Sequence, residues 1–307
     1  MPSRLLPIPE GLAGARADAG LSRLLGLSRS RVADILDAHG ATVDGRPLGR
    51  SDRLSPDQTV EITWEEPRPV VVVPQEVAGM TVRYLDDDLV IVEKPVGVVA
   101  HPATSWTGPT VLGGLAALGI SVAPAGPPER QGIVQRLDVG TSGLMMVARS
   151  VPAYSALKDM FRAHTVRKTY AAVVHGQMDP LEGTIDAPIG RSPGADWKFA
   201  VVAGGKRAVT HYETLEAFRY GSLLRLQLET GRTHQIRVHL STERHPLMGD
   251  PLYGGDPVLA RTLGLTRQWL HAERLRFRHP MTGEPVDVRS EFPPDLQTAL
   301  DRLRSGE

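Results

Sequence analysis

Cysteine is absent from this sequence, and so is any excess of charge of one sign. The 307 residues contain no Cys, which excludes disulfides, thiolate metal ligands and cysteine nucleophiles. The 35 basic residues equal the 35 acidic ones, so net charge argues neither for nor against a nucleic-acid partner. Only five of the basic residues are Lys. A GC-rich genome is the preferred explanation of the Arg bias, and a need for planar contacts to phosphates and base edges is the alternative.

Long hydrophobic runs are missing too. No apolar stretch approaches the roughly 18 residues that cross a bilayer. The N-terminus, MPSRLLPIPEG, is too polar and proline-rich for a secretory signal. Apolar residues make up 41% of the chain, enough for an ordinary globular core. We therefore expect a soluble cytoplasmic protein with no membrane partner.

Prolines divide the chain into two parts. Residues 1–66 read as a small unit with two helical patterns, DAGLSRLLGL and SRSRVADILDAHG, and an alternating strand, QTVEITW. Pro67, Pro69 and Pro74 follow closely, and proline stiffens a connection and blocks helix formation. The sequence thus predicts a linker at 67–79 and a second domain at 80–307.

The second domain is rich in predicted strands. The clearest are in LVIVEKPVGVVAHP, GLMMVARS, KTYAAVVHG, LLRLQLETG and RLRFRHP. Helical patterns are fewer, in TVLGGLAALG, PAYSALKDMFRAH and PPDLQTALDRLR. Because strands and helices do not alternate regularly, the sequence favours the α+β class.

One acidic residue stands out within the second domain. In QRLDVGTSGLM, Asp138 lies between two strand-like runs, on a stretch with Gly140 and Gly143. A lone Asp before a glycine-containing turn is most often only a turn residue. The stretch is not an aspartic-protease motif, since Val139 and Gly140 interrupt it and no second copy supplies a dyad. The residues alone leave the role of Asp138 open.

The same stretch closely resembles the signature of RluA/RluD-type pseudouridine synthases, H-R-L-D-x-x-T-S-G-L. RLDVGTSGL, residues 136–144, matches every specified position after the first, where Gln135 stands in place of the usual His. Other blocks resemble the family in order, and the resemblance covers roughly nine-tenths of the chain. These blocks are LDDDLVIVEKPVGVVAHP, RKTYAAVVHG, ETGRTHQIRVHL, HPLMGDPLYGG and LHAERLRFRHPMTGE, with an S4-like RNA-binding segment in front.

The resemblance implies a fold and a reaction. The expected fold is a large mixed, mainly antiparallel central sheet flanked by helices and loops, preceded by a small α/β S4-like domain. The expected reaction isomerises uridine in RNA to pseudouridine by breaking the C1′–N1 bond, turning the base and rejoining it through C5. The target nucleotide must leave the base stack, at a cost of a few kcal/mol. The chemistry is redox-neutral, so no cofactor is expected.

Site residues follow from the same resemblance. Asp138 becomes the essential carboxylate, although attack at C1′, attack at C6 and deprotonation at C2′ all remain open. Tyr170 would stack on the uracil, and Arg237 would pair with Asp138 and keep it ionised. The residues expected to bind substrate or RNA are Arg136, which would fill the gap left by the flipped base, Thr141 and Ile236, an apolar wall.

No metal site is expected. His234 and His239 lack a third ligand at suitable spacing, and the resembled family needs no metal. We expect Gln135 to be tolerated, because an amide still donates and accepts hydrogen bonds. The protein is expected to be a monomer.

The front segment raises a separate question. Residues 1–66 contain eight Arg but ten Asp or Glu, so the unit is not basic overall. Arg16, Arg29 and Arg31 lie around its two predicted helices and are its candidate RNA contacts. Whether these arginines can bind RNA depends on whether the fold places them on one face of the unit.

Three functions remain in competition. Large-subunit (23S) ribosomal RNA is the preferred substrate on family resemblance alone, and transfer RNA is the alternative. An inactive RNA-binding protein in ribosome assembly is the third, with only Gln135 in its favour.

Overall fold

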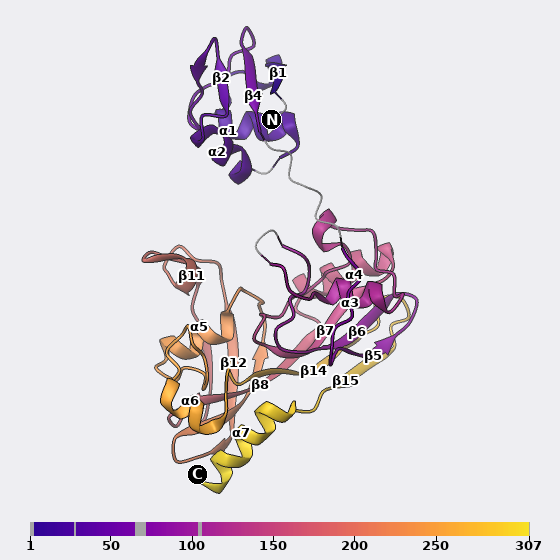
Figure 1. Cartoon of the computed structure of the whole chain (residues 1–307), viewed down its shortest axis with the longest axis vertical. Helices are drawn as coiled ribbons and strands as arrows, with labels where there is room; N and C mark the ends of the chain where they lie inside the picture. The colour runs from indigo at the N-terminus through magenta and orange to yellow at the C-terminus, as the bar shows by residue number, and fades with distance from the viewer. Residues whose placement is uncertain (1–2, 28, 65–71, 104–105, 307) are drawn as a thin grey trace. The chain divides into compact units, whose positions relative to one another are not determined.

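The chain forms two compact units, residues Met1–Arg68 and Pro69–Glu307. The computed structural model describes residues 3–27, 29–64, 72–103 and 106–306 (Figure 1). Within them, no helix is both long and apolar enough to cross a membrane.

The first unit is a small four-stranded sheet with two helices. Its strand order is β1-β4-β2-β3, and every pairing is antiparallel. Alternating residues of the predicted strand QTVEITW, Val60 and Ile62, are fully buried in a core with Leu21 and Val32 from the helices. The elements are β1 (Ser3–Pro7), α1 (Ala17–Leu25), α2 (Arg29–Asp37), β2 (Ala41–Val43), β3 (Arg46–Pro47) and β4 (Thr59–Thr63).

The second unit is built on one large sheet. Among the described residues nine strands join it, in the order β5-β6-β7-β14-β8-β13-β12-β9, with β15 paired to β14. Only the contact between β7 and β14 is parallel. The sheet strands are β5 (Thr81–Leu85), β6 (Leu89–Lys94), β7 (Ser142–Ala148), β8 (Arg167–His175), β9 (Glu182–Asp186), β12 (Val209–Ala217), β13 (Gly221–Leu228), β14 (Leu270–Arg278) and β15 (Pro285–Arg289).

Two strands, β10 (Ile189–Ser192) and β11 (Ala195–Val201), form a separate hairpin. Helices accompany the sheet (Figure 1), and in the described part of the chain there are five of them besides short 3-10 turns. They are α3 (Val111–Ala117), α4 (Val151–Arg162), α5 (Gln235–Thr242), α6 (Pro257–Leu263) and α7 (Pro294–Ser305). Ser150 caps α4 by accepting a hydrogen bond from the Ala153 amide, which satisfies one of the unpaired N–H groups at a helix start.

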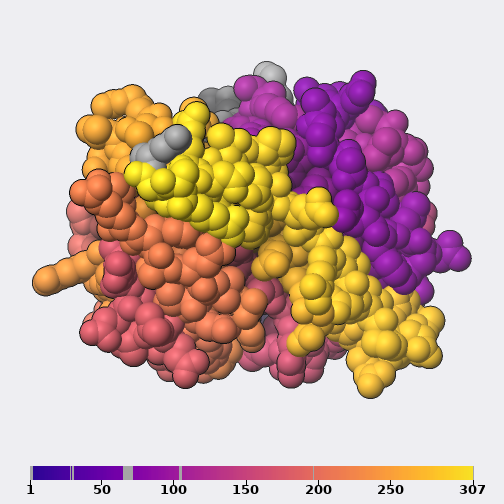
Figure 2. Space-filling model, turned by 90° about the horizontal axis from the view of Figure 1, so that it is seen from below, coloured from indigo at the N-terminus to yellow at the C-terminus, as the bar shows by residue number. Residues whose placement is uncertain are grey.

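Strand alternation distributes the helices over both faces of the sheet. On β6, Val90 and Val92 join the core that contains α3, whereas Leu89 and Ile91 join the core that contains α4. The residues of β8 alternate in the same way. One set packs in the core that contains α5, and the other set packs in the core that contains α7. Figure 2 shows α7, in yellow, lying on the orange part of the chain, where its buried residues pack with those of α6. Both faces of the central strands are therefore shielded from water.

These observations confirm the α+β class and the mixed, mainly antiparallel sheet. The five strand runs and three helices predicted for the second domain are all present. Two helices, α5 and α6, were missed. In α5 all of Gln235–Leu240 is buried, so the segment has no polar face and shows no helical periodicity in the sequence.

The predicted linker lies partly outside the described residues, which begin again at Val72. From there the segment packs on the second unit. Val77 is 8% exposed within the sheet core, and Val72 and Met80 pack against it. The Gln75 amide donates to the Gly113 carbonyl at 3.1 Å. Residues 72–79 thus belong physically to the larger unit.

Candidate active site

Asp138 lies on a short turn directly before β7. The Thr141 amide donates to the Asp138 carbonyl at 3.0 Å, which closes the turn. The Gly97 amide donates to the Val139 carbonyl at 2.9 Å and ties the turn to the loop after β6. Because β6 and β7 are neighbouring buried strands, this turn is fixed to the rigid part of the sheet.

Two glycines of the motif make room for the protein's own chain. Gly143 has φ +113°, and a Cβ there would lie 2.3 Å from the Ala272 carbonyl oxygen on β14. A Cβ on Gly140 would lie 2.5 Å from the side chain of Gln268. The sequence pattern indicated a turn here but not these contacts. Both glycines allow β7 and its turn to approach β14 closely.

Arg237 joins Asp138 to a second, buried carboxylate. Its Nε donates to Asp250 Oδ2 at 2.7 Å and its Nη2 to Asp250 Oδ1 at 2.9 Å. The remaining Nη1 donates to Asp138 Oδ2 at 3.3 Å. Asp250 Oδ1 also accepts from the backbone amides of Leu252 and Tyr253, and its side chain is 0% exposed. Asp250 therefore holds the guanidinium in one orientation, and Asp138 takes the nitrogen left over.

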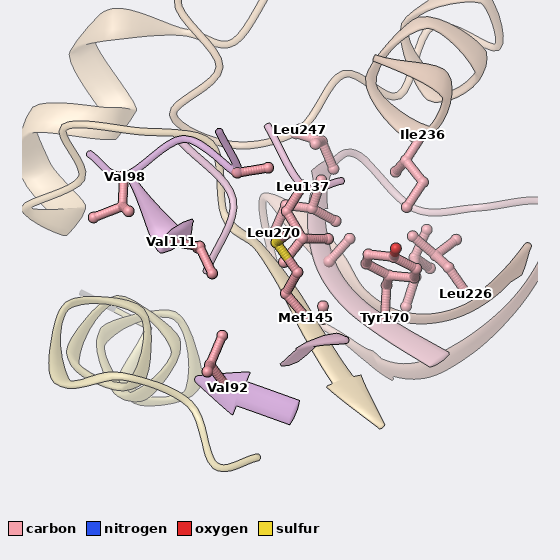
Figure 3. Packing of buried hydrophobic residues seen from close by; sticks show 14 of the residues in the cluster. Val92, Val98, Val111, Leu137, Met145, Tyr170, Leu226, Ile236, Leu247 and Leu270 are labelled. Carbon is pink, nitrogen blue, oxygen red and sulfur yellow. The ribbon is translucent and has the colours of Figure 1, made fainter. Parts of the chain in front are cut away.

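An apolar pocket adjoins this charge cluster. Tyr170 on β8 and Ile236 on α5 are 7% and 4% exposed, and both line the pocket that also contains Asp138. Figure 3 shows Ile236 pointing toward the Tyr170 ring, with Leu226 beside it. Burial, and secondarily the charge of Asp138, raise the pKa of Tyr170. Its phenol thus stays protonated at neutral pH and can donate a hydrogen bond.

His234 stands at the entrance to α5 with φ 56°, in the left-handed region. Its Nδ1 lies 2.9 Å from the Tyr253 hydroxyl, and its Nε2 lies 3.9 Å from Asp138 Oδ2. Burial lowers the pKa of His234, with Arg237 and Arg136 acting in the same direction and Asp138 opposing them. A neutral imidazole whose Nδ1 lies at the Tyr253 hydroxyl can donate or accept hydrogen bonds next to Asp138.

Lys94 is a buried cation near the catalytic turn. Its side chain is fully buried at the end of β6, and Nζ donates to the carbonyls of Pro95 and Val98 at 2.9 and 2.8 Å. Burial lowers its pKa to about 7, and the negative charge of Asp138 opposes that shift. Lys94 thus holds the loop that supports the Asp138 turn.

The other residues expected at the substrate pocket take different positions. Arg136 is exposed and lines the Asp138 pocket and two neighbouring ones. Thr141 lines the Asp138 pocket but is 2% exposed, and its hydroxyl accepts from Gln268 Nε2 at 3.3 Å. The fold brings Asp138, Tyr170 and Arg237 together from segments up to 99 residues apart.

In the first unit, two of the candidate arginines meet on one carboxylate. Arg16 Nε donates to Asp18 Oδ1 at 3.2 Å, and Arg29 Nη2 donates to Asp18 Oδ2 at 2.9 Å. Hydrogen bonds from Arg16 and then Arg29 lower the pKa of Asp18 to about 2. Arg31 follows on α2 and is half-buried. Two arginines are therefore presented side by side, with one negative charge between them.

One further group among the described residues has the composition of a metal site. Asp86, Asp88 and His279 offer ligand atoms within 4.8 Å of one another. Asp86, however, already accepts from the amides of Asp88 and Leu89, each at 2.8 Å, and from the Tyr84 hydroxyl at 2.7 Å. These bonds close the turn between β5 and β6, so the cluster has a structural explanation.

Asp250 and Lys94 are members of the site that the sequence patterns did not reveal. Asp250 lies between Gly249 and Pro251 in HPLMGDPLYGG, a stretch that resembles the family without pointing to a role for its acid. Lys94 is one of only five lysines and stands directly before Pro95, at the end of an apolar strand. The sequence signal available for both residues was a charged side chain within an apolar stretch. Such a charge requires a partner when it is buried.

Comparison with known proteins shows the family of this chain. The family model described as RNA pseudouridylate synthase matches residues 88–242, which include Asp138, Tyr170 and Arg237. An uncharacterised RNA pseudouridine synthase of Mycobacterium bovis is 53% identical over 305 residues, covering 99% of both chains. The ribosomal large subunit pseudouridine synthase D of Xanthomonas campestris is 39% identical, covering 97% of this chain and 91% of its own.

Solved structures show the same fold for the second unit. Human RNA pseudouridylate synthase domain containing 1 is 27% identical with a TM-score of 0.58, covering 74% of this chain and 89% of its own. The family match, the relatives and the shared fold define the class of this protein, an RNA-modifying isomerase. The chain belongs to the RNA pseudouridine synthase family, within its RluA/RluD-type branch.

Proposed function

We propose that this pseudouridine synthase modifies specific uridines of large-subunit ribosomal RNA, acting in the cytoplasm as a monomer. The support for the substrate is the relatives named ribosomal large subunit pseudouridine synthase D. Besides the Xanthomonas protein, the Neisseria meningitidis one is 41% identical over 97% of this chain. Both matches include the first unit as well as the catalytic one.

The observation that carries the site assignment is the shared guanidinium of Arg237. Asp250 fixes it, and its free Nη1 lies 3.3 Å from Asp138. In this proposal Asp138 is the reacting carboxylate, aimed at the sugar or base of the flipped uridine by Arg237. The bond from C1′ to N1 breaks and the bond from C1′ to C5 forms. The C5 hydrogen leaves as a proton, and N1 takes up a proton, so that the product is an isomer of the substrate.

The apolar pocket would hold the uracil. Tyr170 stacks on the base and Ile236 closes the opposite side, which excludes water while the base turns. Arg136, exposed at the pocket mouth, enters the space that the base leaves. Thr141 supports the turn that carries Asp138.

The first unit would act as an S4-like RNA-binding domain. Arg16 and Arg29 converge at the starts of α1 and α2, where backbone N–H groups also favour phosphate. Arg31 continues the same helix. Such contacts position RNA without taking part in the chemistry.

Pseudouridine mapping tests the substrate. The gene is deleted, and pseudouridines in ribosomal and transfer RNA are compared with those of the parent strain. We expect one or more sites in the large-subunit RNA to lose pseudouridine and to regain it on re-expression. Loss confined to transfer RNA would overturn the ribosomal assignment while leaving the isomerase activity intact.

A further inference from the structure

A larger pocket adjoins the Asp138 pocket. It measures about 550 Å³ and lies between the end of α4, the start of β8 and the loop after β13. Arg136, Tyr170 and Arg232 line both pockets, so the two are continuous. The proposed mechanism uses the Asp138 pocket for the base and leaves this larger one without a role.

Lys168 is the unusual residue of the larger pocket. It lies on β8 two residues before Tyr170, lines the pocket and is only 9% exposed. Burial alone lowers its pKa to about 8, and no carboxylate among the described residues opposes the shift. Its nearest recorded partner is the Phe161 ring, 5.8 Å from Nζ. A buried ammonium without an anion costs free energy, which a bound anion would offset.

The surrounding charges add to the same imbalance. The titratable and charged groups that line the pocket around Lys168 are Arg136, Lys158, Arg162, His164, Glu229 and Arg232. Glu229 is the only acid among them, and it already pairs with Arg207 at 2.9 Å and with His211 at 3.0 Å. Arg162 pairs with Asp159 on the surface of α4. The pocket therefore keeps an excess of positive charge directed at its interior.

The wall opposite Lys168 leaves space for a ligand backbone. Gly231 lies beside Lys168, and a Cβ placed on Gly231 would be 3.8 Å from Nζ. The next residue, Arg232, also lines the pocket, and its Nε donates to the Arg207 carbonyl at 2.9 Å. A lysine and an arginine thus line the same pocket, next to a glycine.

We propose that Lys168 and Arg232 bind one backbone phosphate of the RNA, next to the nucleotide whose base enters the Asp138 pocket. This site rests on the proposed function, since it assumes that RNA lies across both pockets. An ammonium is a compact charge with no preference for a base edge, so it suits a phosphate oxygen. Holding that phosphate fixes the sugar of the flipped nucleotide relative to Asp138.

Lysine NMR provides a direct test. The chain has only five lysines, so protein labelled with ¹³C at lysine Cε gives few signals, and Lys168→Met identifies the relevant one. In free protein we expect this signal to titrate near pH 8. With a saturating transcript of large-subunit RNA it should titrate at least one pH unit higher, because a phosphate favours the charged amine. An unchanged titration in the complex would overturn the proposal.

A binding experiment tests the consequence. Lys168→Met should weaken RNA binding about tenfold and make the log–log salt plot shallower by about 0.7, the value for one contact to single-stranded RNA. Lys158→Met is the matched control, since Lys158 is exposed at the rim of the same pocket. We expect it to change binding less than threefold. Equal effects of the two variants would mean that only general charge matters, and would contradict a defined site.

The melting temperature separates this role from a structural one. Removing an unpaired buried charge should leave the melting temperature of Lys168→Met unchanged or higher. A lower melting temperature with unchanged RNA affinity would make Lys168 a packing residue and sink the proposal. The proposed substrate can be wrong independently of this phosphate site. In that case pseudouridine mapping would point to another RNA, and the same three measurements would be made with that RNA.

Discussion

Two clusters of aspartate and arginine, one in each unit, use the same chemistry in opposite surroundings. In the first unit Asp18 pairs with Arg16 and Arg29, whose side chains are 44% and 61% exposed. In the second, Asp250 and Asp138 share Arg237, which is 7% exposed. Water therefore reaches both arginines of the first cluster, although Asp18 itself is only 11% exposed. In the second cluster Arg237 and Asp250 are closed off from water, and Asp138 is 15% exposed.

Burial decides what each cluster can do. An exposed pair contributes little to stability, and its arginines can exchange the carboxylate for a phosphate at low cost. A buried pair is costly to break, because the remaining charge loses its partner away from water. The exposed cluster is therefore suited to reversible RNA contact, and the buried cluster to holding one geometry through many turnovers.

The largest expected effect comes from removing the proposed reacting carboxylate. Asp138→Asn keeps the shape but can act neither as nucleophile nor as base, so turnover should fall at least about 10³-fold. Tritium release from C5-labelled uridine in RNA measures it. RNA affinity should stay nearly unchanged, since the substitution removes no phosphate contact. Substantial residual turnover would remove Asp138 from the centre of the mechanism.

The second-largest effect is a loss of stability, which we compare between the two clusters by removing one carboxylate from each. Asp250→Asn leaves the buried Arg237 without its main partner and should destabilise the catalytic unit by about 3 kcal/mol. Asp18→Asn, in the exposed cluster, should have a small effect that added salt removes. Hydrogen exchange of peptides from each unit in a urea series reports both. Similar losses in the two variants would contradict the distinction by burial.

Acid should weaken the catalytic unit before the first unit. His271 is 0% exposed between the Ser142 and Ser290 hydroxyls, and burial, with a smaller contribution from Arg267, lowers its pKa from 6.5 to about 4. The unfolded chain binds the proton first, so stability is highest above pH 6.5 and falls as pH drops toward 4. The loss should reach about 3 kcal/mol.

The control for this pH dependence is His271→Gln, which carries no titratable ring. Unfolding of the variant between pH 7 and 4 should vary less steeply than unfolding of the wild type. The only histidine of the first unit, His39, is exposed, in contrast to the buried His271. An equally steep acid transition in the variant would assign the effect to other groups.

The smallest effect on chemistry is expected from removing the first unit. A protein that starts at Pro69 retains Val72 and Val77, which pack on the catalytic core. It should bind RNA less tightly, with a shallower salt dependence, because phosphate contacts are lost. Its single-turnover rate at saturating RNA should stay within about tenfold, or roughly 1.4 kcal/mol of barrier. Unchanged affinity and salt slope would make Arg16 and Arg29 surface charges only.

The sequence was sufficient where local patterns carry the information. Alternation along QTVEITW and the apolar run of β7 predicted buried strands, since side chains of a strand alternate between two faces. The RLDVGTSGL motif, taken with the resembled family, singled out Asp138 from the sequence alone. Helix α5 was not predicted because every residue of its first turns is buried. The segment therefore lacks the exposed polar face that gives a surface helix its periodic sequence pattern.

Only the tertiary structure decided how the charges are paired. Arg237 was expected to pair with Asp138, yet its two shortest bonds go to Asp250, 13 residues away. Lys94 and Lys168 look like ordinary lysines in the sequence. Only the fold buries Lys94 against two carbonyls, and only the fold places Lys168 in a pocket whose one acid, Glu229, pairs with other residues. Partner choice and burial depend on contacts between distant segments, which no local pattern contains. The sequence by itself indicated most of the elements and, through the resembled family, the proposed reacting residue. The packing of those elements determined which charges meet and which face an open pocket.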